Sequence, residues 1–283
     1  SIALDLDAAA DREVLDQLLE RADVLVENFR PGTMEKLGFG WDVLHARHPR
    51  LVYAAVSGFG RTGPYAARPA YDMVVQGMGG VMSVTGEEGG APTRVGVSIG
   101  DITAGLFLAT GINAALYHRA VSGEGMLVDV AMLDCQVAIL ENAIARYTAI
   151  GDVPGPIGSR HPSIAPFAAL RTLDGEVVVA AGNDKLFAAL CEVVGRPEVA
   201  RDPRFVDNHA RCEHVHALHA ELERALAART TAEWLAVLHA AGIPSGPVND
   251  VAAVVDDPHV QARHMVVDVA DAAAGPLRVA GNP

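Results

Sequence analysis

The sequence predicts an α/β fold, in which a doubly wound, mostly parallel sheet forms a large domain and a second, smaller α+β domain follows. Two observations predict it. In the first half of the chain, short uninterrupted apolar segments alternate with helical segments, as is typical of parallel strands that helices bury on both faces. After residues 151–166, which are rich in proline and glycine, the pattern changes to an apolar hairpin and several helices. A chain of 283 residues, half of them apolar, is long enough for both domains.

The elements of the large domain follow from the spacing of apolar residues. Alternating or continuous apolar runs mark strands, and apolar residues three or four positions apart mark helices. In order, we predict a strand at 2–6, a helix at 11–22, a strand at 23–28, a helix from near Pro31 to before Gly38 and a helix at 41–48. A strand at 51–58, a helix from Asp101 to about His118, a strand at 126–132 and a long helix to about residue 149 follow.

The second part of the chain has a different organisation. Asp174-Gly175 lies between two apolar runs and predicts a β-hairpin. Further elements are helices at 184–194, 211–228 and 231–241 and strands at 246–249 and 265–270. We therefore predict a large domain at 1–150, a connection at 151–166, a small α+β domain at 167–264, and a segment at 265–283 that returns towards the large domain.

Composition and charge exclude several kinds of function. The net charge is −13 and the only lysines are Lys36 and Lys185, so no basic stripe is present to bind nucleic acid. An anionic ligand must therefore be held by arginines, backbone amides or helix N-termini. Three widely spaced cysteines fit a reducing, cytoplasmic location. The apolar segment at 102–118 is interrupted by polar residues and predicts a buried core helix, so we expect no membrane partner.

The loop after the strand at 51–58 has the spacing G-x-G-x-x-G, at Gly58, Gly60 and Gly63. A dinucleotide site needs a helix to begin there, with an acidic residue about 20 positions further on. Pro64 follows instead, and Asp72 comes too early. The glycines are better explained as a loop that bends close to a ligand or to another part of the backbone.

The segment 28–32 lies at the carboxyl end of a predicted parallel strand, where ligands collect in open α/β sheets. Asn28 offers an amide, Phe29 a flat apolar face and Arg30 a guanidinium suited to phosphate. Lys36 could add charge from the following helix. An ordinary strand–turn–helix connection with a solvated Arg30 explains the same residues equally well.

Asp101 stands where a helix N-cap is expected, and an aspartate in that place most often only caps the helix. The same carboxylate could act as a nucleophile, because Gly100 leaves one side open and helix-terminal amides stabilise negative charge. Tyr71 and Asp72 form a polar pair within an apolar stretch. The two residues are candidates to support such chemistry. Alternatively, Tyr71 is a half-buried tyrosine and Asp72 lies on the surface of a loop.

Four histidines and a cysteine lie close together in the second part of the chain. A zinc site needs four ligands, usually from more than one segment, whereas these share one helical region and fit solvated helix residues. They are His209, Cys212, His214, His216 and His219. We therefore predict no metal site, and the absence of a G-x-S-x-G turn gives no support to a serine hydrolase.

Seven segments together resemble the class III CoA-transferase family, which includes formyl-CoA transferase, carnitine CoA-transferase and the related 2-methylacyl-CoA racemases. They occur in the family's order over nearly the whole chain. The segments are ADVLVENFRPGTMEKLGFG, PRLVYAAVSGFGRTGPY, YDMVVQGMGG, TGEEGGAPTRVGVSIGDITAG, ALYHRAVSGEGMLVDVAMLD, VAAGNDKLF and AGIPSGPVND.

The resemblance implies a role for each candidate residue. Asp101 becomes the nucleophile that forms an acyl anhydride and then an aspartyl-CoA thioester, while Tyr71 and Asp72 border the reacting thioester. CoA is expected along four residues, Asn28, Phe29, Arg30 and Lys36. The resemblance further implies that CoA and acyl-CoA are substrates and that no cofactor is permanently bound. It implies that two chains form an interlocked homodimer. Residues 1–150 would form the CoA-binding domain.

The sequence also departs from the family's pattern. From the resemblance we expect that the family's N-terminal and C-terminal segments are missing from this sequence. The run of glycines that the formyl-specific enzymes carry before the small domain is absent from 151–166. The resemblance therefore points away from formyl and oxalyl substrates, and we expect a dicarboxylic acyl donor such as succinyl-CoA.

Three other functions compete with CoA transfer. A racemase of the same superfamily would need a base where Tyr71 stands, and an unperturbed tyrosine, with a pKa of about 10, is a poor base at neutral pH. A non-catalytic CoA-binding module would bind without forming a covalent intermediate. A nicotinamide-dependent enzyme rests on the glycine loop alone.

Overall fold

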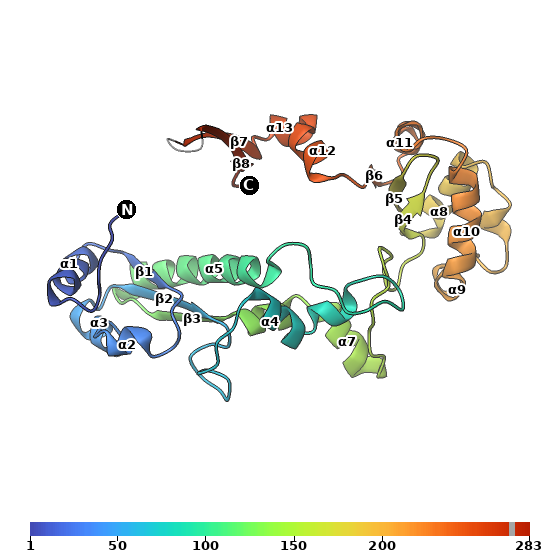
Figure 1. The fold of residues 1–283 in the computed structure, drawn as a ribbon. Coiled ribbons are helices and arrows are strands. Elements are labelled where there is room, and N and C mark those ends of the chain that lie inside the picture. Colours follow the sequence, from blue (N-terminus) through green and yellow to red (C-terminus); the bar gives the residue numbers. More distant parts are fainter. Residues whose placement is uncertain (272–274) are drawn as a thin grey trace. The chain divides into compact units, whose positions relative to one another are not determined.

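The computed structural model describes residues 1–271 and 275–283, and these form two compact units, Ser1–Gly158 and Ser159–Pro283 (Figure 1). The division falls within the segment 151–166. The first unit contains a parallel sheet with helices, and the second contains antiparallel strands with helices. The predicted fold class, α/β with a further α+β part, is confirmed.

The first unit is built on three parallel strands in the order β1-β2-β3, with β2 in the centre. Their register aligns Val26, Ala54 and Val128 across the sheet. The strands are β1 (Val24–Glu27), β2 (Val52–Ser57) and β3 (Leu127–Ala131). The helices are α1 (Ala9–Leu19), α2 (Thr33–Lys36), α3 (Trp41–Arg47), α4 (Asp72–Met78), the 3₁₀ helix η1 (Val81–Val84), α5 (Ile99–Ser122), α6 (Met132–Ala138) and α7 (Glu141–Ile150).

Helices cover both faces of this sheet, which explains the uninterrupted apolar character of β2. Tyr53 and Ala55 point to one face, where they pack with side chains of α1, α2 and α3. On the other face Val56 packs with Val75 of α4 and Ala104 of α5. Because successive strand residues alternate between faces, a strand covered on both must be apolar at nearly every position.

Helix α5 belongs to the crossover from β2 to β3 and packs against both strands. The side chains it buries are mostly small, whereas Leu106, Tyr117 and Val121 are exposed. The prediction of a buried core helix is therefore correct for one face only. Within the described residues, α5 is the one helix long and apolar enough to cross a membrane by length and composition.

Two of the elements predicted in the first unit differ from the structure. Residues 2–6 form no strand, because the Asp5 N–H donates to the Asp11 carboxylate (2.7 Å) in the approach to α1 instead of pairing with a neighbouring strand. The long helix predicted before residue 149 is two helices, α6 and α7. The Leu140 N–H bonds to the Val137 carbonyl three residues back, which tightens the last turn of α6 and ends it.

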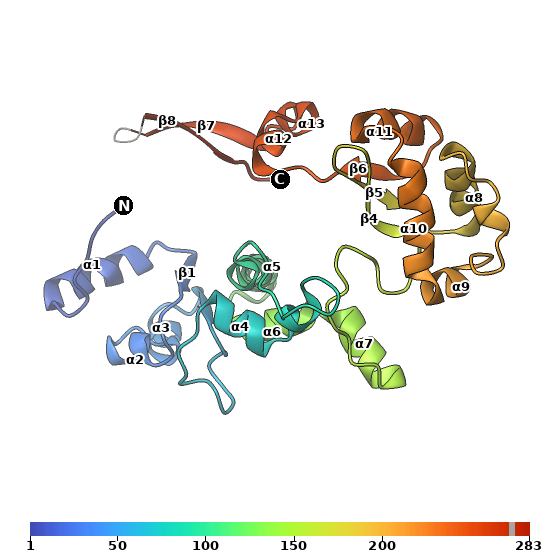
Figure 2. The same ribbon diagram turned by 45° about the vertical axis from the view of Figure 1, so that its right-hand side comes forward.

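The second unit begins with an antiparallel sheet in the order β4-β5-β6, which packs against α10 and α11 (Figure 2). The hairpin predicted at Asp174-Gly175 joins β4 to β5 and is confirmed. The strands are β4 (Phe167–Arg171), β5 (Glu176–Ala180), β6 (Ser245–Pro247), β7 (Val266–Asp271) and β8 (Gly275–Ala280). The helices are α8 (Asp184–Val193), η2 (Val199–Arg201), α9 (Asn208–Glu213), α10 (Val215–Leu226), α11 (Thr231–Ala240), α12 (Val251–Asp256) and α13 (Pro258–Ala262). Strand β8, which pairs with β7, was not predicted.

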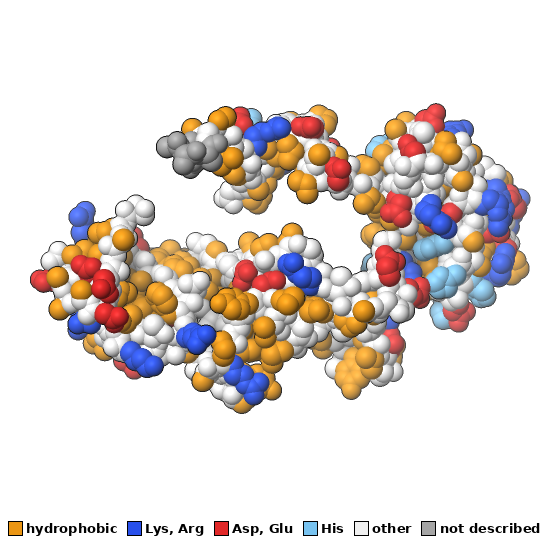
Figure 3. All heavy atoms as spheres, viewed as in Figure 1, with side chains coloured by type: hydrophobic (Ala, Val, Ile, Leu, Met, Phe, Trp, Pro, Cys, Tyr) orange, Lys and Arg blue, Asp and Glu red, His pale blue; other side chains and the backbone are white. Residues whose placement is uncertain are grey.

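Histidine side chains are visible at several places on the surface of the second unit (Figure 3), and His209, His214 and His216 are exposed. His209 forms an ion-pair contact with Glu213, one helical turn further on. In the described ranges, no three His, Cys, Asp or Glu side chains come together in a group that could hold a metal ion.

A buried arginine organises the core of the second unit. Arg211 is 1% exposed, and its guanidinium donates to the carbonyls of Ala165 (2.7 Å) and Phe205 (3.1 Å) and to the carboxylate of Asp184 (2.7 Å). It also lies over the ring of Phe187. These bonds replace the water that a buried guanidinium loses, and they join four separate segments.

Replacing Arg211 by alanine should therefore destabilise the second unit by about 3–5 kcal/mol, since two buried carbonyls lose their donor. Arg224, which is exposed and pairs with Glu221 within one helix, is the matched control, and its alanine variant should lose under about 1 kcal/mol. Urea unfolding of both variants measures this difference. Equal losses would show that Arg211 has no such role.

Candidate active site

The three parallel strands end at the same edge of the sheet, and a cavity of about 550 Å³ opens there. Its walls come from loops that follow the strands and from the helices that begin beside them. The lining residues are Asn28, Phe29, Arg30 and Pro31 after β1, Val56, Ser57 and Gly58 at the end of β2, Arg68, Pro69, Ala70 and Tyr71 before α4, Asp101, Ala104 and Gly105 of α5, and Met132 of α6.

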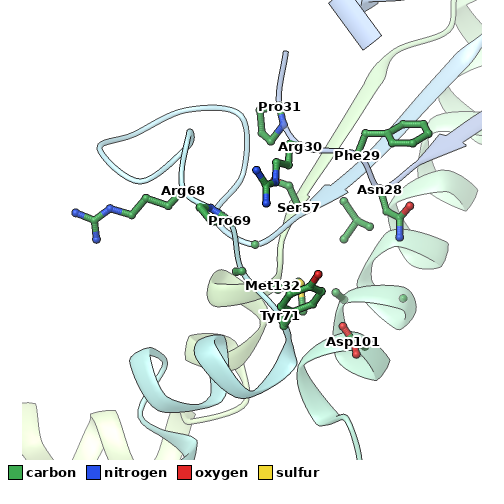
Figure 4. A pocket seen from close by; sticks show the side chains of 15 residues that line it. Asn28, Phe29, Arg30, Pro31, Ser57, Arg68, Pro69, Tyr71, Asp101 and Met132 are labelled. Atoms are coloured by element: carbon green, nitrogen blue, oxygen red, sulfur yellow. The ribbon is translucent and has the colours of Figure 1, made fainter. Parts of the chain in front are cut away.

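The cavity brings together five of the seven residues predicted for the site: Asn28, Phe29, Arg30, Tyr71 and Asp101. Figure 4 shows Tyr71 and Asp101 at the same side of this space, with Arg30 opposite them and the Arg68 side chain directed away.

The other two predicted residues, Lys36 and Asp72, are not among the lining residues. Lys36 is the last residue of α2, and the Asp72 carboxylate is turned towards the backbone at the start of α5.

The prediction that Asp101 is a helix N-cap is wrong. Helix α5 begins two residues earlier, at Ile99, with Ser98 as the N-cap residue, so Asp101 lies in the first turn. The Ser98 side chain makes no capping hydrogen bond. Asp72 supplies it instead: its Oδ1 accepts from the Gly100 N–H at 2.8 Å. The Asp101 carboxylate is thereby released from capping, and within the described part of the chain it accepts no hydrogen bond.

The Asp101 side chain is exposed, but its partial loss of solvent at the cavity raises the pKa of the carboxyl above its ordinary value, and the nearby negative charge of Asp72 raises it further. A carboxylate with a raised pKa is more basic, and basicity favours nucleophilic attack. The N-terminal end of α5 carries partial positive charge, which stabilises negative charge that develops near the first turn.

A second group of charges fixes the loop that carries Asn28, Phe29 and Arg30. Glu27, 8% exposed, ends β1 and accepts from the Phe29 N–H (2.7 Å) and more weakly from the Tyr53 hydroxyl (3.4 Å). Burial raises the pKa of Glu27, while these donors and Arg61 oppose the rise. The loop is thus held by a buried carboxylate at its base.

Arg61 connects this base to the glycine-rich loop. Its guanidinium lies 3.6 Å from Glu27 and pairs with Glu35 of α2, while its backbone N–H donates to Asp129 of β3 (3.0 Å).

No helix begins at Gly58, Gly60 or Gly63. Gly58 has a packing role, because a Cβ there would lie 2.3 Å from the Cβ of Ala70. The loop follows a different course from the helix start that a dinucleotide site requires.

Comparison with known proteins identifies the family. Residues 1–283 match CoA-transferase family III. The chain belongs to CoA-transferase family III. It is 46% identical to the acetyl-CoA:oxalate CoA-transferase of Acetobacter aceti, with all of this chain and 72% of that protein covered. It is 38% identical to the succinate–glutarate CoA-transferase of Agrobacterium fabrum, with 95% of this chain and 67% of that protein covered.

Solved structures agree with the assignment to CoA-transferase family III. A CAIB/BAIF family protein from Brucella suis superimposes with a TM-score of 0.83 at 38% identity, covering all of this chain and 78% of that one. Rv3272 from Mycobacterium tuberculosis superimposes with a TM-score of 0.89 at 33% identity, covering all of this chain and 76% of that one. The predicted membership of the class III family and the predicted enzyme class, a CoA-transferase, are both confirmed.

Sequence reasoning missed several residues that support the site of this CoA-transferase. Glu27 and Arg61 were not singled out, although a charge at the end of an apolar strand was a visible signal for Glu27. Gln76 is fully buried and bonds to Asp72, yet it lies within an apolar helix with no local pattern to mark it.

Gly100 leaves room for Asp72 and Val75 beside α5. A Cβ at this position would lie 2.8 Å from Val75 Cγ2 and 3.0 Å from Asp72 Oδ1. Gly100→Ala should therefore destabilise the first unit by about 1–3 kcal/mol, because the packed neighbours must move.

Gly105→Ala is the control for Gly100→Ala, because a Cβ at residue 105 meets no atom within 4 Å. Within a helix, alanine is more favourable than glycine by about 0.5–1 kcal/mol. Thermal unfolding of the two variants should shift in opposite directions. Shifts in the same direction would contradict the close contact at Gly100.

The raised pKa of Asp101 makes the stability of the CoA-transferase depend on pH. The folded protein holds this proton more tightly than the unfolded chain, so the free energy of unfolding falls as pH rises from the ordinary aspartate pKa of 3.8 through the raised value. Asp101→Asn removes this loss. The free energy of unfolding of the variant minus that of the wild type should therefore be larger at pH 7 than at pH 3. Urea unfolding of both proteins at the two pH values measures this difference. A difference independent of pH would contradict the raised pKa.

Proposed function

We propose that this CoA-transferase moves CoA from an acyl-CoA to a free carboxylic acid through covalent intermediates on Asp101. One observation carries the proposal. A carboxylate without a hydrogen-bond partner among the described residues faces a cavity at the carboxyl edge of a parallel sheet, in the first turn of a helix. Ligands of α/β proteins bind at this edge, and a carboxylate that neither caps nor pairs is available to react.

The proposed reaction begins with attack of the Asp101 carboxylate on the thioester carbonyl of the donor. The C–S bond breaks, CoA leaves as a thiolate, and a mixed anhydride remains on Asp101. The thiolate then attacks the aspartyl carbonyl, which releases the first carboxylate and leaves an aspartyl-CoA thioester. Positive charge at the N-terminus of α5 stabilises the oxyanions that these attacks generate.

The second half of the reaction repeats these steps in reverse order. The acceptor carboxylate attacks the aspartyl thioester, the C–S bond breaks, and a new anhydride forms with release of the thiolate. Attack of the thiolate on the acceptor carbonyl then yields the new acyl-CoA and restores the Asp101 carboxylate. No proton, oxidant or reductant is consumed overall.

We place CoA along Asn28, Phe29 and Arg30, which line the cavity opposite Asp101. Phe29 is about half exposed and offers an apolar surface, and the Arg30 guanidinium suits a phosphate. Lys36 lies at the end of α2, outside the lining, and its proposed part is to attract the anionic ligand over a longer distance.

A dicarboxylic acyl group fits this proposal. The names of several relatives specify dicarboxylic acids, among them succinate, glutarate and mesaconate. Succinyl-CoA is therefore the first donor to test. The relative that acts on oxalate makes oxalate an acceptor to include, against the expectation from the missing glycine run.

The chemistry of Tyr71 favours transfer over racemisation. Tyr71 lines the cavity and is exposed, and no lining residue is a histidine. A tyrosine hydroxyl donates a hydrogen bond well at neutral pH and removes an α-proton poorly. Tyr71 is therefore proposed to support the reacting carbonyl.

Asp101→Asn tests the proposal directly. The amide is a poor nucleophile, so CoA exchange between succinyl-CoA and free dicarboxylic acids should fall at least about a thousand-fold. Mass spectrometry of new thioesters measures the exchange. In the wild type, incubation with succinyl-CoA followed by hydroxylamine or borohydride should modify Asp101 and leave the neighbouring carboxylates unmodified.

The control is Asp134→Asn, which removes an aspartate from the first turn of α6 that does not line the cavity. This variant should exchange CoA at the wild-type rate. Undiminished exchange by Asp101→Asn would overturn the covalent mechanism. CoA binding without trapping or exchange would indicate a non-catalytic module, and deuterium entry at the α-carbon of a 2-methylacyl-CoA without CoA transfer would indicate a racemase.

A further inference from the structure

The start of α5 lacks a cap of its own. The first N–H groups of any helix have no partner within the helix, and a serine at the N-cap position ordinarily satisfies one of them. Here the Ser98 side chain does not, and the Gly100 N–H donates instead to Asp72 Oδ1 at 2.8 Å. Asp72 is 28 residues earlier in the chain, at the start of another helix, α4.

The orientation of the Asp72 carboxylate is itself fixed. Its second oxygen, Oδ2, accepts from the side-chain amide of Gln76 at 2.8 Å. Gln76 is fully buried, and its own oxygen accepts from the Val95 N–H at 2.9 Å. One chain of hydrogen bonds therefore runs from the segment before α5, through Gln76 and Asp72, to the first turn of α5.

We propose that Asp72 is a positioning residue of the transfer reaction, which holds the first turn of α5, and with it Asp101, through the hydrogen bond to Gly100. This inference rests on the proposed role of Asp101 as nucleophile. Asp72 does not line the cavity and acts through the backbone. Gly100 is suited to this contact, because a side chain there would collide with Asp72 and Val75.

The same carboxylate acts on Asp101 through its charge. Asp72 is the second cause, after burial, of the raised pKa of Asp101. The other charged or titratable groups of this region are Arg30 and Tyr71 in the cavity lining, Arg68, whose side chain is directed away from the cavity, and Arg94, whose guanidinium lies 3.9 Å from Asp72. None of these replaces the hydrogen bond to Gly100, so the positional and electrostatic effects of Asp72 can be separated by substitution.

Three variants separate them. Asp72→Ala removes the hydrogen bonds and the charge. Asp72→Asn keeps an oxygen that accepts from the Gly100 N–H, but its NH₂ group then faces the NH₂ group of Gln76, so the hydrogen bond between these two side chains is lost. The double variant Asp72→Asn with Gln76→Glu exchanges amide and carboxylate, so that every hydrogen bond of the chain can form again. Asp207→Ala is the control, since Asp207 caps α9 in the second unit by the same kind of bond to the Ala210 N–H.

Initial rates of CoA exchange with succinyl-CoA should separate kcat from KM. We expect Asp72→Ala to lower kcat roughly 10- to 100-fold with KM for acyl-CoA within about two-fold, because a small displacement of a reacting group slows chemistry more than binding. The double variant should recover kcat to within about five-fold of the wild type. Asp207→Ala should lose stability, by about 1 kcal/mol, without a change in kcat per folded molecule.

The pH profile gives a readout that a purely structural role would not move. Loss of the Asp72 charge lowers the pKa of Asp101, so the acid limb of kcat/KM should shift to lower pH in Asp72→Asn. If Asp72→Ala does not fold, Asp72→Asn carries the test, with a smaller loss of kcat and the same shift of the acid limb.

Wild-type kcat and an unshifted acid limb in folded Asp72 variants would overturn the inference, as would a double variant as slow as Asp72→Asn. Asp101→Asn distinguishes this failure from failure of the proposed function. If Asp101→Asn is inactive while the Asp72 variants are normal, the covalent role of Asp101 stands and the positioning role of Asp72 falls.

Discussion

The parallel pairing of β1, β2 and β3 is the constraint on which the site depends. Parallel strands need a crossover between them, and each crossover must leave one edge of the sheet and return at the other. The loops after all three strands therefore meet at one edge, and α5, within the crossover from β2 to β3, begins near it. Asp101 comes to face the residues of the loop after β1 because of this topology, although 70 residues separate it from Pro31.

The sequence was sufficient to predict what depends on local pattern. The continuous apolar strands, the hairpin at Asp174-Gly175 and most helices follow from spacing and turn residues. The strand at 2–6 was wrong because alternation says nothing about whether a neighbouring strand exists. The break between α6 and α7 depends on a backbone turn at Leu140 that neither proline nor glycine marks.

The candidate site shows the same division. Asn28, Phe29, Arg30, Tyr71 and Asp101 were found in motifs and do line one cavity. The N-cap assignment of Asp101 failed because the cap comes from Asp72, and no local rule connects a helix start to a carboxylate 28 residues away. Glu27 and Arg61 were missed for a similar reason: their importance lies in each other and in Glu35, which only the folded chain brings together.

The close approach of Gly58 to Ala70 ties together the two ends of the loop between them. The entropy of closing a loop grows only slowly with its length, by about 0.6 kcal/mol for each doubling. Residues added or removed between Thr62 and Ala67 would therefore cost little stability, since the junctions with β2 and α4 stay fastened. Natural variation or engineering can therefore change the length of this loop, which lies next to the lining residues Arg68 and Pro69, while both of its junctions keep their places.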